Sequence, residues 1–423
     1  MFGLVATGIR RGTIAVTSRG WLFGAVFVII GLFVVWVFGL PVPSDMLSTF
    51  RLSGGGDLIQ LPNIPLPTQA TNLLLGLIIA ATGIYHLVRG FARPNLVLGL
   101  NFLLLVLAFL TWSIRCGSLN LSGLLESTLL RATPFLLGAL SGIMCERSGV
   151  INIAVEGMML MAAFVSVVAT NLAGGNLWVG LAAGLASGAL LAAIHAFLSI
   201  QFKVDQIISG TLINIFSAGM TNYLALTLLT RNQWLNDSHT FPALPIPVLS
   251  QIPIIGPIFF DQNIIVYAAL ILMFVVQFVL YYTRWGLRTR AVGEHPKAAD
   301  TLGVNIFQIR YINVIMGGLL AALAGCFLTL GSVGRFNNLM SNGRGFISLA
   351  AMIFGNWTPF GSFVAALIFG FADSLQIKLQ ILSSSIPSDF LLMAPYIATM
   401  IVLAGVVGRA TPPAADGQPY EKQ

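Results

Sequence analysis

The sequence predicts an all-α fold, a polytopic bundle of transmembrane helices, and two observations lead to this prediction. Of the 423 residues, 57% are hydrophobic and only 8% are charged, and the mean hydropathy is +0.90. A soluble domain carries roughly 25% charged residues to cover its surface with water-compatible groups. Apolar windows of about 20 residues, enough for a helix to cross the hydrocarbon core, recur along the chain. Most of the chain must therefore face lipid.

About eleven windows are long and apolar enough to span a membrane. They cover residues 20–40, 70–89, 95–114, 121–144, 151–172, 176–200, 206–230, 263–282, 309–332, 359–381 and 388–408. A shorter apolar piece at 345–355 predicts a half-helix, and counting it brings the expected number of spans to about twelve. The first window is longer than the roughly 7–15 apolar residues of a signal-peptide core and no cleavage pattern follows it, so we interpret it as a retained helix.

The distribution of basic residues between alternate loops predicts which side faces the cytoplasm, because cytoplasmic loops carry an excess of Lys and Arg. With the N-terminus inside, the inner side receives Arg10, Arg11, Arg19, Arg89, Arg93, Arg147, Lys203, Arg284, Arg288, Arg290, Lys297, Arg310, Arg409 and Lys422. The outer side receives only Arg51, Arg115, Arg231, Arg335, Arg344 and, as a further candidate, Lys378. We therefore expect a cytoplasmic N-terminus, and a cytoplasmic C-terminus if the half-helix counts as a crossing.

The sequence lacks the motifs of several enzyme and binding classes. It has no GxxxxGK[ST] phosphate loop, no HExxH zinc pair and no GxSxG nucleophile elbow. The three cysteines have no CxxC spacing, which favours neither a disulfide framework nor a metal site. The net charge of +7 comes from basic residues scattered between apolar stretches, unlike the basic face of a nucleic-acid-binding protein. We expect no catalytic residue, no metal, no cofactor bound by this chain and no nucleic-acid partner.

Glycines repeat every four residues at Gly180, Gly184 and Gly188, and again at Gly138 and Gly142. This spacing is typical of helices whose backbones approach one another closely in a membrane. It predicts helix packing and carries no information about a substrate.

The loop 283–308 is the most charged part of the chain and reads TRWGLRTRAVGEHPKAADTLGVNIFQ. Pro296 suits the first turn of a helix and Gly303 suits its C-terminal cap, so the residues between them predict a short amphipathic helix on the cytoplasmic face. From the pattern alone, this loop is either a solvated linker or a docking element for a partner.

Three stretches resemble ABC importer permeases of the branched-chain amino acid, sugar and nucleoside class. RAVGEHPKAADTLGVN resembles the coupling loop of that class, and ERSGVINIAVEGMMLMAAF (146–164) resembles the signature of its sugar and nucleoside branch, whose members pair with basic membrane lipoprotein type binding proteins. GFISLAAMIFGNWTPFGSFVAALIFGFADSLQ (345–376) resembles the short helix, turn and long helix near the end of the family. The resemblance covers about 121–410 in the family's order.

The resemblance implies a type II importer in the inner membrane of a prokaryote, which works by alternating access. Two permease subunits, identical or homologous, would surround a central path, with ATPase subunits inside and a substrate-binding protein outside. ATP and Mg²⁺ would bind in the ATPase, which agrees with the missing phosphate loop. By resemblance, the coupling residues that enter a groove on the ATPase are Glu294, His295, Pro296, Lys297, Ala298, Ala299, Leu302, Gly303 and Val304.

The chain divides into three expected parts. Residues 1–118 form an extension with three spans that resembles nothing informative, residues 119–410 form the permease core, and the polar, Pro-rich residues 411–423 are expected to be a disordered cytoplasmic tail.

Polar groups inside the spans are the candidates for a substrate path, because such groups are costly in lipid. The candidates are Asn152, Glu156, Asn214, Asn222, Asp373 and Gln376. They either hydrogen-bond neighbouring helices together or line the path and meet the hydroxyl groups of a solute. His195 is expected to be a packing residue, and Arg131 to snorkel or to pair with Glu126.

Taken together, these features predict the permease subunit of an ATP-driven ABC importer for a nucleoside or a sugar. An ABC permease for another small polar solute is an alternative. A second alternative is an ion-coupled secondary transporter, in which Glu156 and Asp373 would be the coupling groups; the coupling-loop motif argues against it. A non-transporting scaffold would leave both carboxylates unexplained.

Overall fold

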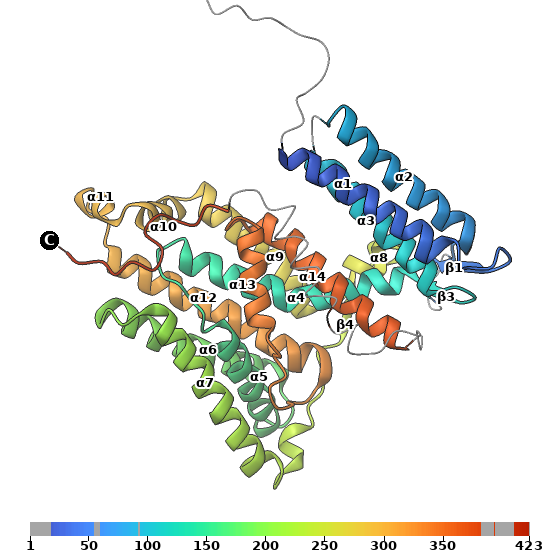
Figure 1. Ribbon diagram of the computed structural model, residues 1–423. Helices are drawn as coiled ribbons and strands as arrows, with labels where there is room; N and C mark the ends of the chain where they lie inside the picture. The colour runs from blue at the N-terminus through green and yellow to red at the C-terminus, as the bar shows by residue number, and fades with distance from the viewer. Residues whose placement is uncertain (1–17, 55–59, 92–93, 382–392, 394–409, 423) are drawn as a thin grey trace, which may run out of the picture.

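The computed structural model describes residues 18–54, 60–91, 94–381, 393 and 410–422, and within them the fold is a helical bundle (Figure 1). Nine helices of the described part are long and apolar enough to cross a membrane. They are α2 (Thr68–Val88), α3 (Pro94–Ser113), α4 (Leu121–Glu146), α5 (Val155–Leu172), α6 (Leu177–Ala196), α7 (Gln206–Leu224), α9 (Ile264–Tyr282), α12 (Ile306–Leu328) and α14 (Pro359–Ile381). Each matches a predicted window.

The remaining predicted pieces are also placed, with one exception. The first window becomes α1 (Ser18–Phe33) and a π-helical turn, η1 (Val34–Gly39), and the predicted half-helix becomes α13 (Arg344–Phe354). Further π-helical turns extend α6, α7 and α12: η2 (Phe197–Gln201), η3 (Ala225–Leu229) and η6 (Thr329–Val333). The last window, 388–408, lies outside the described residues. The polytopic all-α fold class is confirmed.

Several spanning helices begin at an Asn or Asp that accepts hydrogen bonds from the first-turn N–H groups, which have no partner inside the helix. Asp205 accepts from the N–H groups of Ile207 and Ile208 at the start of α7, and Asn263 does the same for α9. Asn120, Asn176 and Asn305 cap α4, α6 and α12. These caps fix the helix starts near the predicted boundaries.

The helices α4 and α12 form the centre of the core. Of the apolar window in each, 89% is buried in α4 and 78% in α12, against 28% in α6 and α7, which therefore present most of their surface outward. The predicted glycine face of α6 packs against α5 and α12: a Cβ on Gly184 would lie 3.1 Å from the carbonyl oxygen of Ala162, and one on Gly188 would clash with the Cβ of Ala322.

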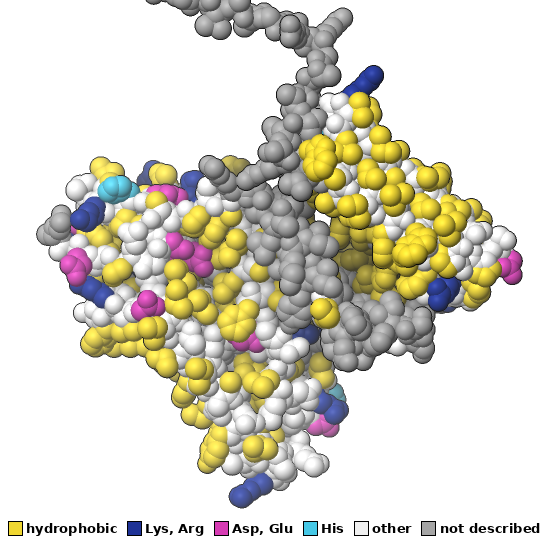
Figure 2. All heavy atoms as spheres, viewed as in Figure 1, with side chains coloured by type: hydrophobic (Ala, Val, Ile, Leu, Met, Phe, Trp, Pro, Cys, Tyr) yellow, Lys and Arg dark blue, Asp and Glu magenta, His cyan; other side chains and the backbone are white. Residues whose placement is uncertain are grey.

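The N-terminal part packs on the core through a small sheet that the sequence did not predict. Strand β1 (Leu47–Arg51) pairs antiparallel with β2 (Ile64–Pro67) and parallel with β3 (Ser118–Asn120), and α4 follows β3 directly. Phe50 and Leu119 of this sheet are buried in one cluster with Leu124 of α4 and with Leu375 and Leu379 of α14. Hydrophobic side chains cover the outer face of α1–α3, as expected for a lipid-facing surface (Figure 2).

The segment between η3 and α9 contains several short elements. They are η4 (Gln233–Asn236), β4 (Ala243–Pro245), η5 (Leu249–Gln251), α8 (Ile255–Phe259) and β5 (Asp261–Asn263), of which β4 and β5 pair antiparallel. The side chain of Asn236 and the backbone of Phe241 hydrogen-bond to the segment that follows α12. This loop therefore lies at the same end of the bundle as β1–β3, which we call the sheet end.

The opposite end carries the turns at 147–151, 201–205, 283–305 and 355–358, together with the chain segment 410–422, and we call it the tail end (Figure 1, left). Here α10 (Arg284–Glu294) and α11 (Pro296–Thr301) form the predicted amphipathic loop. The loops that the charge bias groups together thus lie at one end.

The segment 410–422 differs from the expected disordered tail. Its backbone and side chains hydrogen-bond to Gly293, Glu294, Asp300 and Asn356, and Tyr420 is buried. The composition of the tail is polar, but Pro413, Ala415 and Tyr420 supply the apolar contacts that hold it.

Candidate functional site

A cluster of charged side chains lies between α4, α13 and α14. The carboxylate of Asp373 in α14 is 3.6 Å from the guanidinium of Arg131 in α4 and 3.9 Å from that of Arg344 at the start of α13. The Asp373 side chain is 18% exposed and that of Arg344 is 19% exposed. Charges that are this far withdrawn from water in a membrane bundle need partners, and they mark paths or binding sites for polar solutes.

Glu156, near the start of α5, holds the beginning of α13. Its Oε1 accepts a hydrogen bond from the N–H of Gly343 at 2.8 Å, and its Oε2 accepts one from the N–H of Gly345 at 2.6 Å. A carboxylate is favourable there because the N-terminus of a helix carries a partial positive charge. Gly345 allows the close approach, because a Cβ at this position would lie 2.6 Å from the backbone of Glu156.

The half-helix α13 has left-handed backbone at both of its junctions. Asn342 and Gly343 precede it with φ of 45° and 77°, and Asn356 and Trp357 follow it with φ of 52° and 53°. A bulky residue such as Trp is rare in this region, and each such residue costs on the order of 1–3 kcal/mol unless its surroundings hold it.

The junction after α13 is held by the C-terminal end of α4 and by the turn that follows it. The indole Nε1 of Trp357 donates to Glu146, the Nε of Arg147 donates to the carbonyl of Trp357, and its Nη2 donates to the carbonyl of Asn356. With an eleven-residue length, α13 spans about half of the hydrocarbon core. It thus connects the tail end to the charged cluster.

The predicted path residues fall into separate groups. Glu156 and Asp373 come together through α13. Asn214 instead joins α7 to α5, because its Oδ1 accepts from the N–H of Gly157 and its Nδ2 donates to the carbonyl of Ile153. Asn152 is fully buried and accepts from the N–H of Ala154.

The remaining polar candidates lie elsewhere or serve packing. Asn222 is exposed and accepts a hydrogen bond from Asn338, and Gln376 is 8% exposed. His195 is buried, with its two ring nitrogens against Ser209 and the carbonyl of Ile151, as a packing residue would be. Arg131 and Arg344 were not among the predicted path residues, although an arginine within an apolar stretch is itself a signal.

The predicted coupling residues form the tip of the tail end. Pro296 is in the first turn of α11, and the Nδ1 of His295 caps this helix by accepting from the N–H of Ala298. Glu294, His295, Lys297, Ala298, Leu302 and Gly303 are exposed, Pro296 and Val304 are half-buried, and Ala299 is buried. Leu302, just after α11, is 84% exposed.

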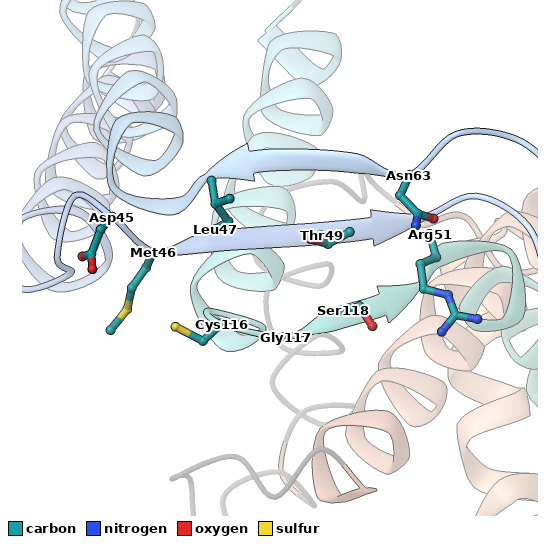
Figure 3. Close-up of a pocket in the computed structure, with 9 residues that line it drawn as sticks. All are labelled: Asp45, Met46, Leu47, Thr49, Arg51, Asn63, Cys116, Gly117 and Ser118. Carbon is teal, nitrogen blue, oxygen red and sulfur yellow. The ribbon is translucent and has the colours of Figure 1, made fainter.

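A hollow of about 770 Å³ opens at the sheet end, beside β1 and β3 (Figure 3). Its lining includes one acidic and one basic side chain, Asp45 and Arg51, together with Cys116. It belongs to the N-terminal extension and contains none of the predicted path or coupling residues.

Comparison with known proteins gives one family. The family described as branched-chain amino acid transport system, permease component, matches residues 124–408. This range lies within the predicted core of 119–410 and leaves out the three N-terminal spans.

Several curated proteins resemble the chain, among them two nucleoside permeases and a putative sugar permease. It is 43% identical over 310 residues to a guanosine ABC transporter permease protein of Bacillus subtilis, and this alignment covers 71% of this chain and 97% of the relative. It is 37% identical over 307 residues to a nucleoside ABC transporter permease protein of Lactococcus lactis, covering 71% and 96%. A putative glucose ABC transporter permease protein of Haloferax volcanii is 40% identical over 267 residues, covering 62% and 79%. No solved structure matches the chain.

Proposed function

We propose a transport role from one premise: the chain belongs to the family of branched-chain amino acid transport system permease components. It is the membrane-spanning permease subunit of an ATP-driven ABC importer, and it carries a nucleoside across the cytoplasmic membrane. The predicted resemblance is thus confirmed at the family level, and the chain is a transport component rather than an enzyme.

The observation that carries the nucleoside assignment is the match to the guanosine permease, which extends over 97% of that relative at 43% identity. A sugar is the second candidate, because the putative glucose permease is 40% identical over a shorter stretch. Both solute classes present hydroxyl groups, which suit the carboxylate and guanidinium groups beside α13.

The partners follow from this role. The tail end faces the cytoplasm, where α11 and the exposed Leu302 dock in an ATPase subunit that binds ATP and Mg²⁺. A second permease subunit, identical or homologous, completes the path, and an external substrate-binding protein delivers the solute to the sheet end. Seven described basic residues of the predicted inner side lie in the turns and the chain segment that define the tail end: Arg147, Lys203, Arg284, Arg288, Arg290, Lys297 and Lys422.

The charged cluster supplies the polar lining of the path. Glu156, Arg344, Asp373 and Arg131 lie where the half-helix α13 begins, and irregular backbone within a membrane is tolerated where it lines a cavity or is buried in protein. In alternating access, α13 shifts between two positions and exposes this cluster to one side and then to the other. The strained junctions of α13 suit an element that has two arrangements.

The test is transport by the reconstituted complex. The chain is combined in liposomes with its ATPase, second permease and binding protein, and guanosine uptake is measured with and without internal ATP, with glucose as competitor. We expect ATP-dependent uptake that glucose leaves unchanged. Uptake driven by an ion gradient without the ATPase would refute the importer and support the secondary-transporter alternative, and inhibition by glucose would favour the sugar.

A further inference from the structure

The segment 410–422 crosses the tail end from the turn after α13 to the turn after η2 (Figure 1). Thr411 donates its N–H to Asn356 at 3.0 Å, Ala415 donates its N–H to the carbonyl of Gly293 at 2.9 Å, and Lys203 pairs with Glu421. We call residues 411–421 the strap. It joins segments that lie far apart in the sequence.

The strap is held most firmly where it meets the predicted coupling loop. Ala414 donates its N–H to the carboxylate of Glu294 at 3.2 Å, and the hydroxyl of Tyr420 donates to Asp300 in α11 at 2.7 Å. Tyr420 is 7% exposed and shares a hydrophobic cluster with Val292, Ala299, Ile306 and Ile309. This cluster joins α10, α11 and α12 in one packing unit.

The strap also reaches the body of the bundle. The guanidinium of Arg310, which is 2% exposed in α12, donates to the carbonyl of Gln418 at 3.0 Å. The carboxyl group of Asp416 interacts with that of Glu146 at the end of α4. Glu146 in turn accepts a hydrogen bond from Trp357, which follows α13. The strap therefore contacts the residues that hold the junction between α13 and α14.

The helix α11 depends on such contacts. It has six residues, and isolated helices shorter than about 12–15 residues are marginal in water. Ala299 is its buried residue and Leu302, just after it, is 84% exposed. The orientation of α11 is therefore set by Ala299, by its turns and by the Tyr420 contact with Asp300.

We propose that the strap is a positioning element, which fixes α11 to α12 and α4 so that a push on α11 reaches the spans, and that Tyr420 is its positioning residue. The inference rests on the proposed function, because the push comes from the ATPase. Without the strap, α11 still presents Leu302 to the ATPase, but α11 then moves independently of α12 and α4. The ATPase hydrolyses ATP, and little solute is transported.

The first experiment measures the attachment alone. Amide hydrogen exchange of α11 is followed by mass spectrometry in the purified chain, in Tyr420→Ala and in a chain that stops after Ala410. We expect exchange in α11 to become at least about tenfold faster in both variants. Tyr420→Phe, which keeps the ring and loses the hydroxyl, gives a smaller increase, and Lys422→Ala, at an exposed position, serves as the unchanged control. Unchanged exchange in both variants would overturn the attachment.

The second experiment measures coupling. In the reconstituted complex we compare the guanosine taken up per ATP hydrolysed. We expect Tyr420→Ala to keep the ATPase bound and its hydrolysis rate within about twofold, while uptake per ATP falls at least about fivefold, a readout that a loss of folded protein would not change. If uptake per ATP is unchanged, or if the ATPase no longer co-purifies, the positioning role is wrong. If the wild-type complex shows no ATP-dependent uptake, the proposed function fails, while the exchange result still decides whether the strap holds α11.

Discussion

At the scale of single residues, the carboxylate of Glu156 is the group on which the position of α13 depends. It accepts from the N–H groups of Gly343 and Gly345, so both of its oxygens are engaged. For Glu156→Gln we expect a loss of about 1–3 kcal/mol in folding free energy, because the amide nitrogen cannot accept a hydrogen bond and the favourable charge at the helix N-terminus is gone. Thermal unfolding of the purified chain measures this loss.

The same variant tests the path. We expect guanosine uptake to fall at least about tenfold while the ATPase still co-purifies, because a change of about 1.4 kcal/mol at the site already corresponds to tenfold. Gln380→Ala, at an exposed position of α14, is the matched control. Wild-type uptake in Glu156→Gln would show that this carboxylate lies outside the path.

A second prediction concerns Asp416 in the strap. Burial raises the pKa of this carboxyl group from 3.8 to about 6. The groups that face it are Glu146, Arg310 and the thiol of Cys145. Because the attached strap binds the proton more tightly than the detached strap, attachment is strongest below the ordinary pKa and weakens as the pH rises from about 4 through about 6.

A spin label at position 422 reports this change. The label is attached to a Lys422→Cys chain that also carries Cys116→Ser. We expect the mobility of the label to increase between pH 5 and pH 7 as the strap loosens, because the carboxyl group of Asp416 becomes charged at about pH 6. Asp416→Asn, which stays neutral, should keep the label in its low-pH state. An equal pH response in both chains would assign the titration to another group.

The charged cluster shows what single residues in a sequence can reveal. Glu156 and Asp373 were candidates because an ionisable side chain in an apolar window is costly and needs a reason. The pairing of Asp373 with Arg131 and Arg344 was not predicted, because it depends on which helices meet. The alternation of loops assigns Arg344 to the outer side, whereas the structure places it at the start of α13.

At the scale of elements, hydropathy and length predicted the spanning helices well, because each spanning helix must cover the same thickness of lipid. The strands β1–β3 were missed because they have three to five residues and no alternating pattern long enough to recognise. The strap was missed because its composition is polar. Its order comes from tertiary contacts of a few side chains, which composition does not report.

The tip of the coupling loop gives a prediction at this scale. Leu302 is 84% exposed, so Leu302→Asp should leave the folding free energy within about 0.5 kcal/mol of wild type. If this leucine enters an apolar groove of the ATPase, the charged side chain should reduce the yield of co-purified ATPase at least about tenfold. Leu339→Asp, at a leucine that is 58% exposed near the sheet end, is the control and should leave the yield unchanged. Equal yields of ATPase for both variants would show that the ATPase docks on another surface.

At the scale of the whole molecule, the two ends of the bundle have different characters. The tail end carries the dense basic loop and the strap, and the sheet end carries the five short strands and the open hollow (Figures 1 and 3). The N-terminal extension packs against α4 and α14 at the sheet end through Phe50, Leu119 and Leu375. These are also the helices that carry Arg131 and Asp373, so the extension packs on the sheet-end parts of both helices.

This polarity makes the orientation in the membrane testable with native cysteines. Cys116 is exposed beside the hollow at the sheet end, whereas Cys145 and Cys326 are buried in the core (Figure 3). If the tail end faces the cytoplasm, a membrane-impermeant maleimide added to intact cells should label the protein at Cys116 alone, because an exposed thiol reacts and a buried one is inert. Cys116→Ser should abolish the labelling. If labelling is absent in intact cells and occurs only in inside-out vesicles, the topology is the inverse of the one proposed. The helix α11 and the strap would then lie outside the cell, where no ATPase can reach them.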